Sequence, residues 1–212
     1  MTPQFSESPQ DGRREELVAA TLRIIARSGV KSATVRAIAQ EANVTLGLIR
    51  YYFNNKEELI VAAFEQHMTN LIDIAASGSE GDFSSAKRRL AMFVYASVRP
   101  PIIDKEVIAV WSAFFQLLFH NEVMRESHKR TYHLLRNQIE QLIRDVYREE
   151  GIAADEQQLR LLSIACNAVL DGLWLEGGVI ADEFADNELV DTVLLSFSRI
   201  IGVDLAKSIT ER

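Results

Sequence analysis

Residues 34–59, TVRAIAQEANVTLGLIRYYFNNKEEL, contain the pattern that decides the fold of this chain. Apolar residues recur at helical spacing and predict one short helix over 34–42 and a second over 45–53. A tight turn at Asn43 separates them, and a longer helix starts near Lys56. This order is typical of a helix-turn-helix, in which the second short helix enters the major groove of DNA.

Individual residues in this stretch support that interpretation. Thr34 and Thr45 each precede an apolar-periodic run, where threonine caps a helix N-terminus. Asn43 lies at the turn, and asparagine tolerates the left-handed backbone conformation. Gly47 costs about 1 kcal/mol relative to alanine inside a helix. We therefore expect position 47 to need close approach to DNA or to the preceding helix.

The same stretch resembles the DNA-binding domain of the TetR family of bacterial transcriptional repressors. The chain departs from the family pattern at Asn43, where glycine is usual, and at Arg50, where tyrosine is usual. The charge of Arg50 affects the expected operator preference and not the fold. The matching positions are Thr34, Ile38, Ala39, Ala42, Val44, Thr45, Gly47, Ile49, Tyr52, Phe53, Lys56 and Leu59.

The charge distribution agrees with a DNA-binding N-terminal region. The 212 residues have a formal net charge of −7. Residues 13–56 contain eight basic and three acidic side chains, so this span is +5 and the remainder is −12. A basic head on an acidic body attracts DNA to one face and repels it elsewhere.

The whole chain predicts an all-α fold. We expect a three-helix, helix-turn-helix DNA-binding domain over 1–55 and a larger helical domain for ligand binding and dimerisation over 56–212. A long helix joins them. The expected helices outside the motif are 12–28, 56–76, 84–98, 105–119, 121–150, 155–180 and 187–206.

Eight side chains of the two short helices and of the start of the following helix are candidates for DNA contact. Arginine can pair with a guanine edge and leucine can touch a thymine methyl group, whereas a lysine at a helix start suits a phosphate. For each of them the alternative is a solvated surface position, and the tyrosines have the further alternative of packing within the domain. The candidates are Arg36, Thr45, Leu46, Leu48, Arg50, Tyr51, Tyr52 and Lys56.

Two segments, WSAFF at 111–115 and DGLWL at 171–175, resemble the C-terminal domain of choline-sensing, BetI-type repressors of the betaine pathway. The resemblance implies an effector pocket, and aromatic rings with a carboxylate attract an organic cation such as choline. The alternative is that the aromatic residues only form core and that Asp171 pairs with an arginine or caps a helix. The candidate pocket residues are Tyr95, Trp111, Phe114, Phe115, Tyr132, Asp171 and Trp174.

Such regulators bind two operator half-sites as dimers, so we expect a homodimer. The eighth and ninth helices are the expected interface because each has a wide apolar face, and intramolecular packing is the alternative use of these faces. Glycines at 172, 177 and 178 are expected to permit close approach across the two-fold axis. The apolar positions are Leu161, Leu162, Ala165, Val169 and Gly172, followed by Val190, Val193, Leu194, Phe197, Ile200 and Ile201.

The sequence therefore predicts a cytoplasmic, homodimeric repressor that a small molecule releases from double-stranded operator DNA. Neither a phosphate-binding loop nor a nucleophile motif occurs, and the four histidines show no metal-binding spacing, so we expect neither an enzyme nor a cofactor or metal. The longest apolar run, 107–119, is too short to span a bilayer. The alternative is a helical protein-interaction module without ligand control, which salt-dependent DNA binding would exclude.

Overall fold

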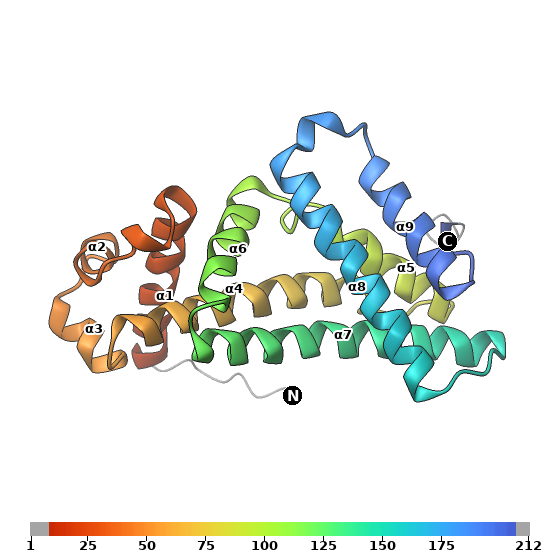
Figure 1. Ribbon diagram of the computed structural model, residues 1–212, viewed down its shortest axis with the longest axis horizontal. Coiled ribbons are helices and arrows are strands. Elements are labelled where there is room, and N and C mark those ends of the chain that lie inside the picture. The colour runs from red at the N-terminus through yellow and green to blue at the C-terminus, as the bar shows by residue number, and fades with distance from the viewer. Residues whose placement is uncertain (1–8, 207–212) are drawn as a thin grey trace. The chain divides into compact units, whose positions relative to one another are not determined.

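The computed structural model describes residues 9–206, with side chains from residue 12 onward, and all regular secondary structure in that part of the chain is helical (Figure 1). The α-helices are α1 (Pro9–Ser28), α2 (Val35–Glu41), α3 (Leu46–Tyr52), α4 (Lys56–Ser77), α5 (Ala86–Ser97), α6 (Lys105–Leu118), α7 (Glu122–Glu150), α8 (Glu156–Val179) and α9 (Glu188–Ile201). Short 3-10 turns occupy Val30–Ser32 and Ala181–Glu183. The predicted all-α fold is confirmed.

The chain divides into two compact units. One holds the residues up to Met68 together with Ala109–His128, and the other holds Thr69–Ile108 together with the chain from Lys129 onward. The first unit thus contains the helix-turn-helix, and α4, α6 and α7 each have residues in both units. In the described residues, no helix is long and apolar enough to cross a membrane.

The helix-turn-helix packs on α1. Helix α1 contacts α2, and α2 contacts α3. Leu17, Ile38 and Ile49 are buried where these helices meet. On the surface of the same pair, the guanidinium groups of Arg23 and Arg27 both bind the carboxylate of Glu41, at 2.9 and 2.5 Å. Apolar burial and this shared ion pair therefore fix α2 against α1.

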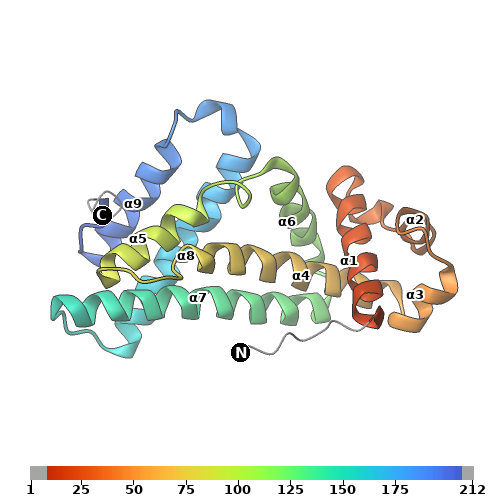
Figure 2. The same ribbon diagram turned by 180° about the vertical axis from the view of Figure 1, so that it is seen from behind.

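In the second unit, α9 packs against α5 and α8 (Figure 2). The apolar face of α9 is buried within the chain, including Val193 and Phe197, which are fully covered. The expectation that this face forms the dimer interface is therefore wrong. The sequence shows that α9 has a wide apolar stripe, but only the fold shows that α5 and α8 cover it.

Two of the three glycines of α8 also pack inside the chain. A Cβ at Gly177 would lie 2.8 Å from Leu189 Cδ1, and one at Gly178 would overlap the side chain of Ile108. A Cβ added at Gly172, in contrast, would meet no neighbouring atom within 4 Å. Gly177 and Gly178 therefore serve intramolecular packing and not the predicted contact across a two-fold axis.

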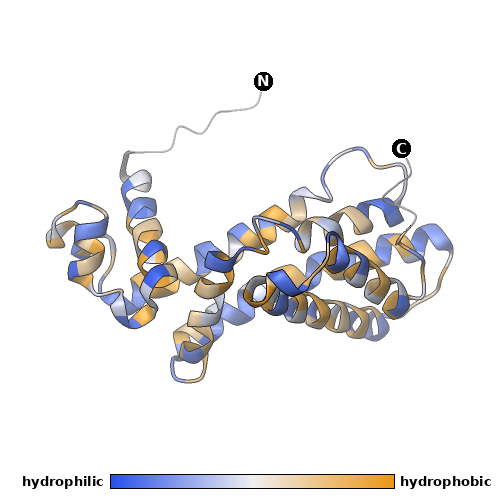
Figure 3. Ribbon diagram, turned by 90° about the horizontal axis from the view of Figure 1, so that it is seen from above, coloured by the Kyte–Doolittle hydropathy of each residue, from blue (hydrophilic) through white to orange (hydrophobic). Residues whose placement is uncertain are grey.

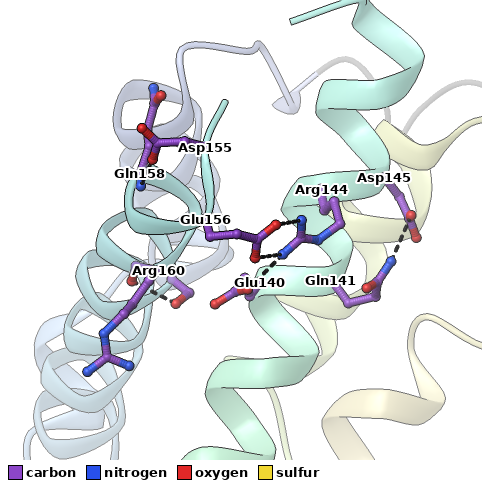
Figure 4. A network of polar contacts seen from close by, with 9 residues as sticks. Glu140, Gln141, Arg144, Asp145, Asp155, Glu156, Gln158 and Arg160 are labelled. Atoms are coloured by element: carbon purple, nitrogen blue, oxygen red, sulfur yellow. Dashed lines mark hydrogen bonds and ion pairs between the residues drawn. The ribbon is translucent and has the colours of Figure 1, made fainter. Parts of the chain in front are cut away.

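Ion pairs tie the start of α8 to α7 (Figure 4). Arg144 on α7 binds both oxygens of Glu156 on α8, at 2.6 and 2.7 Å, and also binds Glu140 at 2.9 Å. The side chain of Asp155 accepts a hydrogen bond from the backbone N–H of Gln158 and caps α8. The polar surfaces of α7 and α8 thus fix the first turn of α8.

The predicted helix ends agree with the structure to within one or two residues except at α1 and α9. Helix α1 begins at Pro9, three residues before the expected start. Helix α9 ends at Ile201, whereas residues 187–206 were expected to be helical. Gly202 follows with φ of 72°, and a glycine in the left-handed conformation ends a helix. Val203 and Leu205 continue the apolar pattern past this glycine, so periodicity alone extends the helix too far. Hydrophobic and hydrophilic residues alternate along the helices of the chain (Figure 3).

Candidate functional site

The two short helices of the motif begin at threonine caps. Thr34 Oγ1 accepts a hydrogen bond from the backbone N–H of Ala37 at 3.2 Å, and Thr45 Oγ1 accepts one from the N–H of Leu48 at 3.4 Å. Between the helices, Asn43 has φ of 51°. Caps of this kind satisfy backbone donors that the first turn of a helix leaves unpaired. The predicted caps and turn are confirmed, and they fix the start of α3.

Helix α3 has a buried face and a solvent face. Ile49 and Phe53 are 3% and 2% exposed, whereas Leu46 and Tyr51 are 40% and 69% exposed. An apolar or aromatic side chain held in solvent is available for contact with another molecule. Of the eight candidates for DNA contact, Arg36, Thr45, Leu46, Arg50 and Tyr51 are exposed, and Leu48, Tyr52 and Lys56 are half-buried.

Gly47 lies on the solvent face of α3. A Cβ added there would meet only Thr45 Oγ1, at 3.7 Å, which is an ordinary van der Waals distance. The expectation that Gly47 allows close packing on the preceding helix is therefore wrong. Of the two reasons offered for a glycine at this position, close approach of DNA is the one that stays a prediction.

A groove of about 270 Å³ runs beside α3, and three cationic side chains line it: Arg36, Arg50 and Lys56. Among the described residues, none of the three lies within ion-pair distance of a carboxylate. Within the part of the chain that the structure describes, no ion pair therefore compensates the positive charge of the groove. A concave surface with unpaired cations attracts an anionic partner.

Sequence analysis missed two asparagines at the edge of this groove. Asn55 Oδ1 accepts from the backbone N–H of Glu58 at 2.8 Å, and Glu58 Oε2 accepts from the backbone N–H of Asn54 at 2.9 Å. This reciprocal cap begins α4. An asparagine followed three residues later by a glutamate is a sequence signal for such a cap, so Asn55 could have been found.

The candidate effector residues are divided between the two units. Trp111, Phe114 and Phe115 belong to the first unit. There Trp111 and Phe115 form an edge-to-face pair with ring centroids 4.5 Å apart, and Phe114 packs on Phe64 of α4 at 5.2 Å. Trp111 and Phe114 are buried. These rings link α6 to α4 within that unit.

The remaining candidates belong to the second unit. The guanidinium of Arg99 lies over the ring of Tyr95, 4.8 Å from its centroid. Trp174 is 1% exposed, and its indole N–H donates to the backbone oxygen of Ser97 at 2.6 Å. Trp174 therefore anchors α8 on α5.

Tyr132 and Asp171 lie together in a polar cluster between α7 and α8. The Tyr132 hydroxyl donates to Asp171 Oδ2 at 2.6 Å, and the side-chain amide of Asn167 donates to the same oxygen at 2.9 Å. The guanidinium of Arg136 lies 5.3 Å from the centroid of the Tyr132 ring. Sequence analysis missed Asn167 and Arg136, although each lies one helical turn from a candidate.

Burial dominates the electrostatics of this cluster. Burial raises the pKa of the Asp171 carboxyl, while the hydrogen bond from Tyr132 and the charge of Arg136 oppose that rise. Burial and the nearby Asp171 charge raise the pKa of the Tyr132 hydroxyl. Tyr132 is therefore protonated at neutral pH and acts as a hydrogen-bond donor.

Two protein families match different parts of this chain. Residues 17–63 match the family described as bacterial regulatory proteins of the tetR family. Residues 86–201, more than half of the chain, match the family described as the C-terminal domain of BetI-type transcriptional repressors. The first match includes α2 and α3, and the second includes the polar cluster at Asp171.

Individual relatives agree with these two matches. The HTH-type transcriptional regulator BetI of Burkholderia thailandensis is 28% identical over 173 residues, which cover 81% of this chain and 85% of that one. A solved structure of a transcriptional regulator from Pseudomonas aeruginosa PAO1 superposes with a TM-score of 0.83 at 26% identity, covering 96% and 97% of the two chains. FadR of Bacillus subtilis, solved in complex with stearoyl-CoA, has the same fold, with a TM-score of 0.69 at 20% identity and coverage of 88% and 97%. The chain belongs to the TetR family of transcriptional regulators and has a BetI-type C-terminal domain.

Proposed function

We propose that α3 and the cationic groove beside it bind operator DNA, and that a small molecule bound in the C-terminal domain releases the repressor. The observation that supports DNA contact at this surface is the uncompensated charge of Arg36, Arg50 and Lys56 in one groove. Members of the family bind operator DNA and small-molecule effectors, typically as dimers. We propose no catalytic role, and we place the protein in the cytoplasm with the DNA.

Each candidate has a proposed type of contact. Lys56 at the start of α4, together with Arg36 and Tyr52, binds phosphates and sets the register on the duplex. Arg50 pairs with a guanine edge, and Leu46 contacts a thymine methyl group. The other candidates, Thr45, Leu48 and Tyr51, contact base edges or the adjacent backbone.

We propose a DNA-binding domain over 1–55 and an effector and dimerisation domain over 56–212. The reciprocal cap at Asn55 and Glu58 begins α4 at this boundary. Helix α4 has residues in both compact units, so an effector that moves α4 changes the position of α3. Because binding free energies are linked, effector and operator then weaken each other's affinity, typically by about 1–3 kcal/mol.

We propose that α8 supplies most of the dimer interface. With the apolar face of α9 buried inside the chain, the exposed and half-buried apolar residues of α8 form the stripe that supports this proposal. Leu161 and Val179 near its two ends are 58% and 66% exposed, and Leu195 on α9 is 57% exposed. The stripe consists of Leu161, Ala165, Ala168, Gly172, Leu175 and Val179, which recur every three or four residues.

For the effector, we propose an organic cation, with choline as the first compound to test. Aromatic side chains in the C-terminal domain, such as the Trp111–Phe115 pair, support this class, because cations bind aromatic faces. Relatives described as BetI regulators support the same choice. The alternative is that these aromatic residues form hydrophobic core and bind no effector.

The test is binding of the purified protein to its own upstream intergenic DNA, followed by titration with choline and other organic cations. The proposal predicts specific binding that weakens with salt and that one effector reverses. Arg50→Ala should lower operator affinity by about 1–3 kcal/mol. Arg148→Ala is the matched control, because Arg148 is 70% exposed on α7 in the other compact unit. Equal loss in both variants, or binding that salt does not weaken, contradicts the proposal and favours a protein-interaction module.

A further inference from the structure

The polar cluster between α7 and α8 has hydrogen-bonding capacity that the chain does not use. Asp171 Oδ2 accepts from both Tyr132 and Asn167, but Asp171 Oδ1 is buried without a hydrogen-bond partner. Asn167 Oδ1 is likewise buried and unpartnered, as is Arg136 Nε. The cluster thus offers two acceptors and one donor.

Unused buried polar atoms are uncommon, because each one loses its water without gaining a partner. Three of them in one cluster leave hydrogen bonds that another molecule can supply. Its group must donate to Asp171 or Asn167 and accept from Arg136. A water molecule, a hydroxyl and a primary amide all meet this requirement.

The charges of the cluster restrict that group further. Asp171 and Arg136 have opposite charges and act on each other within the cluster. The guanidinium of Arg136 also already lies over the Tyr132 ring, which is where a ligand cation would otherwise stack. A carboxylate entering here is attracted by Arg136 and repelled by Asp171, and for an ammonium group the two effects are reversed, so neither charge gains a clear net attraction. An uncharged group avoids both costs.

We propose that this cluster binds an uncharged part of the effector that both donates and accepts hydrogen bonds, namely a hydroxyl or a primary amide. The inference rests on the proposed effector function of the C-terminal domain and specifies which chemical group the site selects. In an organic cation such as choline, the hydroxyl meets Asp171, Asn167 and Arg136, and the quaternary ammonium group binds elsewhere.

Two matched series of small probes test this in the full-length ¹⁵N-labelled protein by NMR. The first is choline, its O-methyl ether, glycine betaine and tetramethylammonium. The second is acetamide, N,N-dimethylacetamide and acetate. The signals to follow are the Nε–H of Arg136 and the side-chain amide of Asn167, each assigned by its loss in Arg136→Lys or Asn167→Leu.

In at least one series, we expect the member with a hydroxyl or primary amide to shift both signals saturably. The ether, dimethylamide, carboxylate and bare cation should bind at least about tenfold more weakly, because each leaves a buried polar atom unpaired. If neither series shows this preference, the cluster holds only water and the inference is wrong. Asn167→Leu should remove the preference, and Asn137→Leu, at an exposed position of α7, should keep it.

Operator binding by the same wild-type sample, without any probe, separates this inference from the proposed function. Probe binding without operator binding contradicts the proposed regulator function and leaves the selectivity of the cluster intact. Operator binding without probe selectivity contradicts only the inference. If Asn167→Leu does not fold, the probe series on the wild-type protein still decides the outcome.

Discussion

Helices α3 and α8 both contain glycine and both bear candidate functional residues. These residues face solvent in α3, whereas in α8 they pack against other helices. A Cβ added at Gly47 in α3 would meet only Thr45 Oγ1, and the nearby side chains of Leu46 and Tyr51 are exposed. Gly178 in α8 is buried against Ile108, and Trp174 one turn earlier is fully covered. The candidate DNA contacts of α3 therefore lie on its surface, whereas the candidate effector residues of α8 make contacts inside the chain. A residue type alone does not show which of these two uses it serves.

The largest effect on the free energy of unfolding is expected inside the C-terminal domain. Trp174→Ala should lower the free energy of unfolding by about 3–5 kcal/mol, because it removes a fully buried aromatic side chain. It also removes the hydrogen bond to Ser97. Urea unfolding followed by circular dichroism measures the change. Phe119→Ala, at an aromatic residue 76% exposed, is the matched control and should stay within about 0.5 kcal/mol. Similar losses in the two variants would show that Trp174 is not a core residue.

Gly178→Ala should destabilise the protein by about 1–3 kcal/mol, because the added methyl group overlaps Ile108 in a packed core. The midpoint of urea unfolding reports this change. Gly12→Ala in α1 is the control, because a Cβ added at position 12 would meet no neighbouring atom within 4 Å. A neutral or stabilising Gly178→Ala contradicts the close packing of α8.

Gly47→Ala in α3 should stabilise the protein, in contrast to Gly178→Ala in α8. The helix gains up to about 1 kcal/mol of stability, because alanine favours a helix more than glycine does and the position has room. Operator affinity should fall nevertheless, since the proposed DNA contact needs close approach at this position. Thermal unfolding and operator titration of the same sample separate the two effects. Unchanged operator affinity would mean that DNA does not approach Gly47.

The smallest effect on stability is expected at surface carboxylates that arginine side chains bind. Both regions contain such a carboxylate. Hydrogen bonds from Arg27 and Arg23 lower the pKa of Glu41, and a hydrogen bond from Arg144 lowers the pKa of Glu156. A lowered folded-state pKa gives stability that is present above the unfolded-state pKa and is lost as pH falls through the folded-state value.

The melting temperatures of Glu41→Gln and Glu156→Gln should therefore lie slightly below that of the wild-type protein at neutral pH. The difference should disappear on acidification below the ordinary glutamate range. A melting series over pH measures both variants against the wild-type protein. A difference that persists in acid would show that the variants act through something other than the ion pairs.

Much of the DNA-binding region could be predicted because its determinants are local. Thr34 and Thr45 cap helices that begin at the next residue, and Asn43 adopts the left-handed conformation that a turn requires. Spacing between neighbours in the sequence contains this information. Only the structure excludes close packing on α2 as the reason for Gly47, because the surroundings of this residue depend on how α2 and α3 pack.

The C-terminal domain was less predictable because its contacts join distant segments. Asp171 meets Tyr132 on another helix, and Trp174 meets Ser97 on a third. Periodicity identified the apolar face of α9 correctly but not its partners, α5 and α8. The unused oxygens of Asp171 and Asn167 appear only after all intramolecular hydrogen bonds are known.

The most direct test of DNA binding through the groove at α3 is the salt dependence of operator affinity in the wild-type protein and in Lys56→Ala. Fluorescence anisotropy between about 50 and 200 mM salt measures it, since each neutralised phosphate contributes to the slope of log affinity against log salt. We expect Lys56→Ala to weaken binding across sequences and to reduce the slope by about one, as the loss of one phosphate contact requires. A slope identical to that of the wild-type protein would contradict the account and place the DNA contact elsewhere.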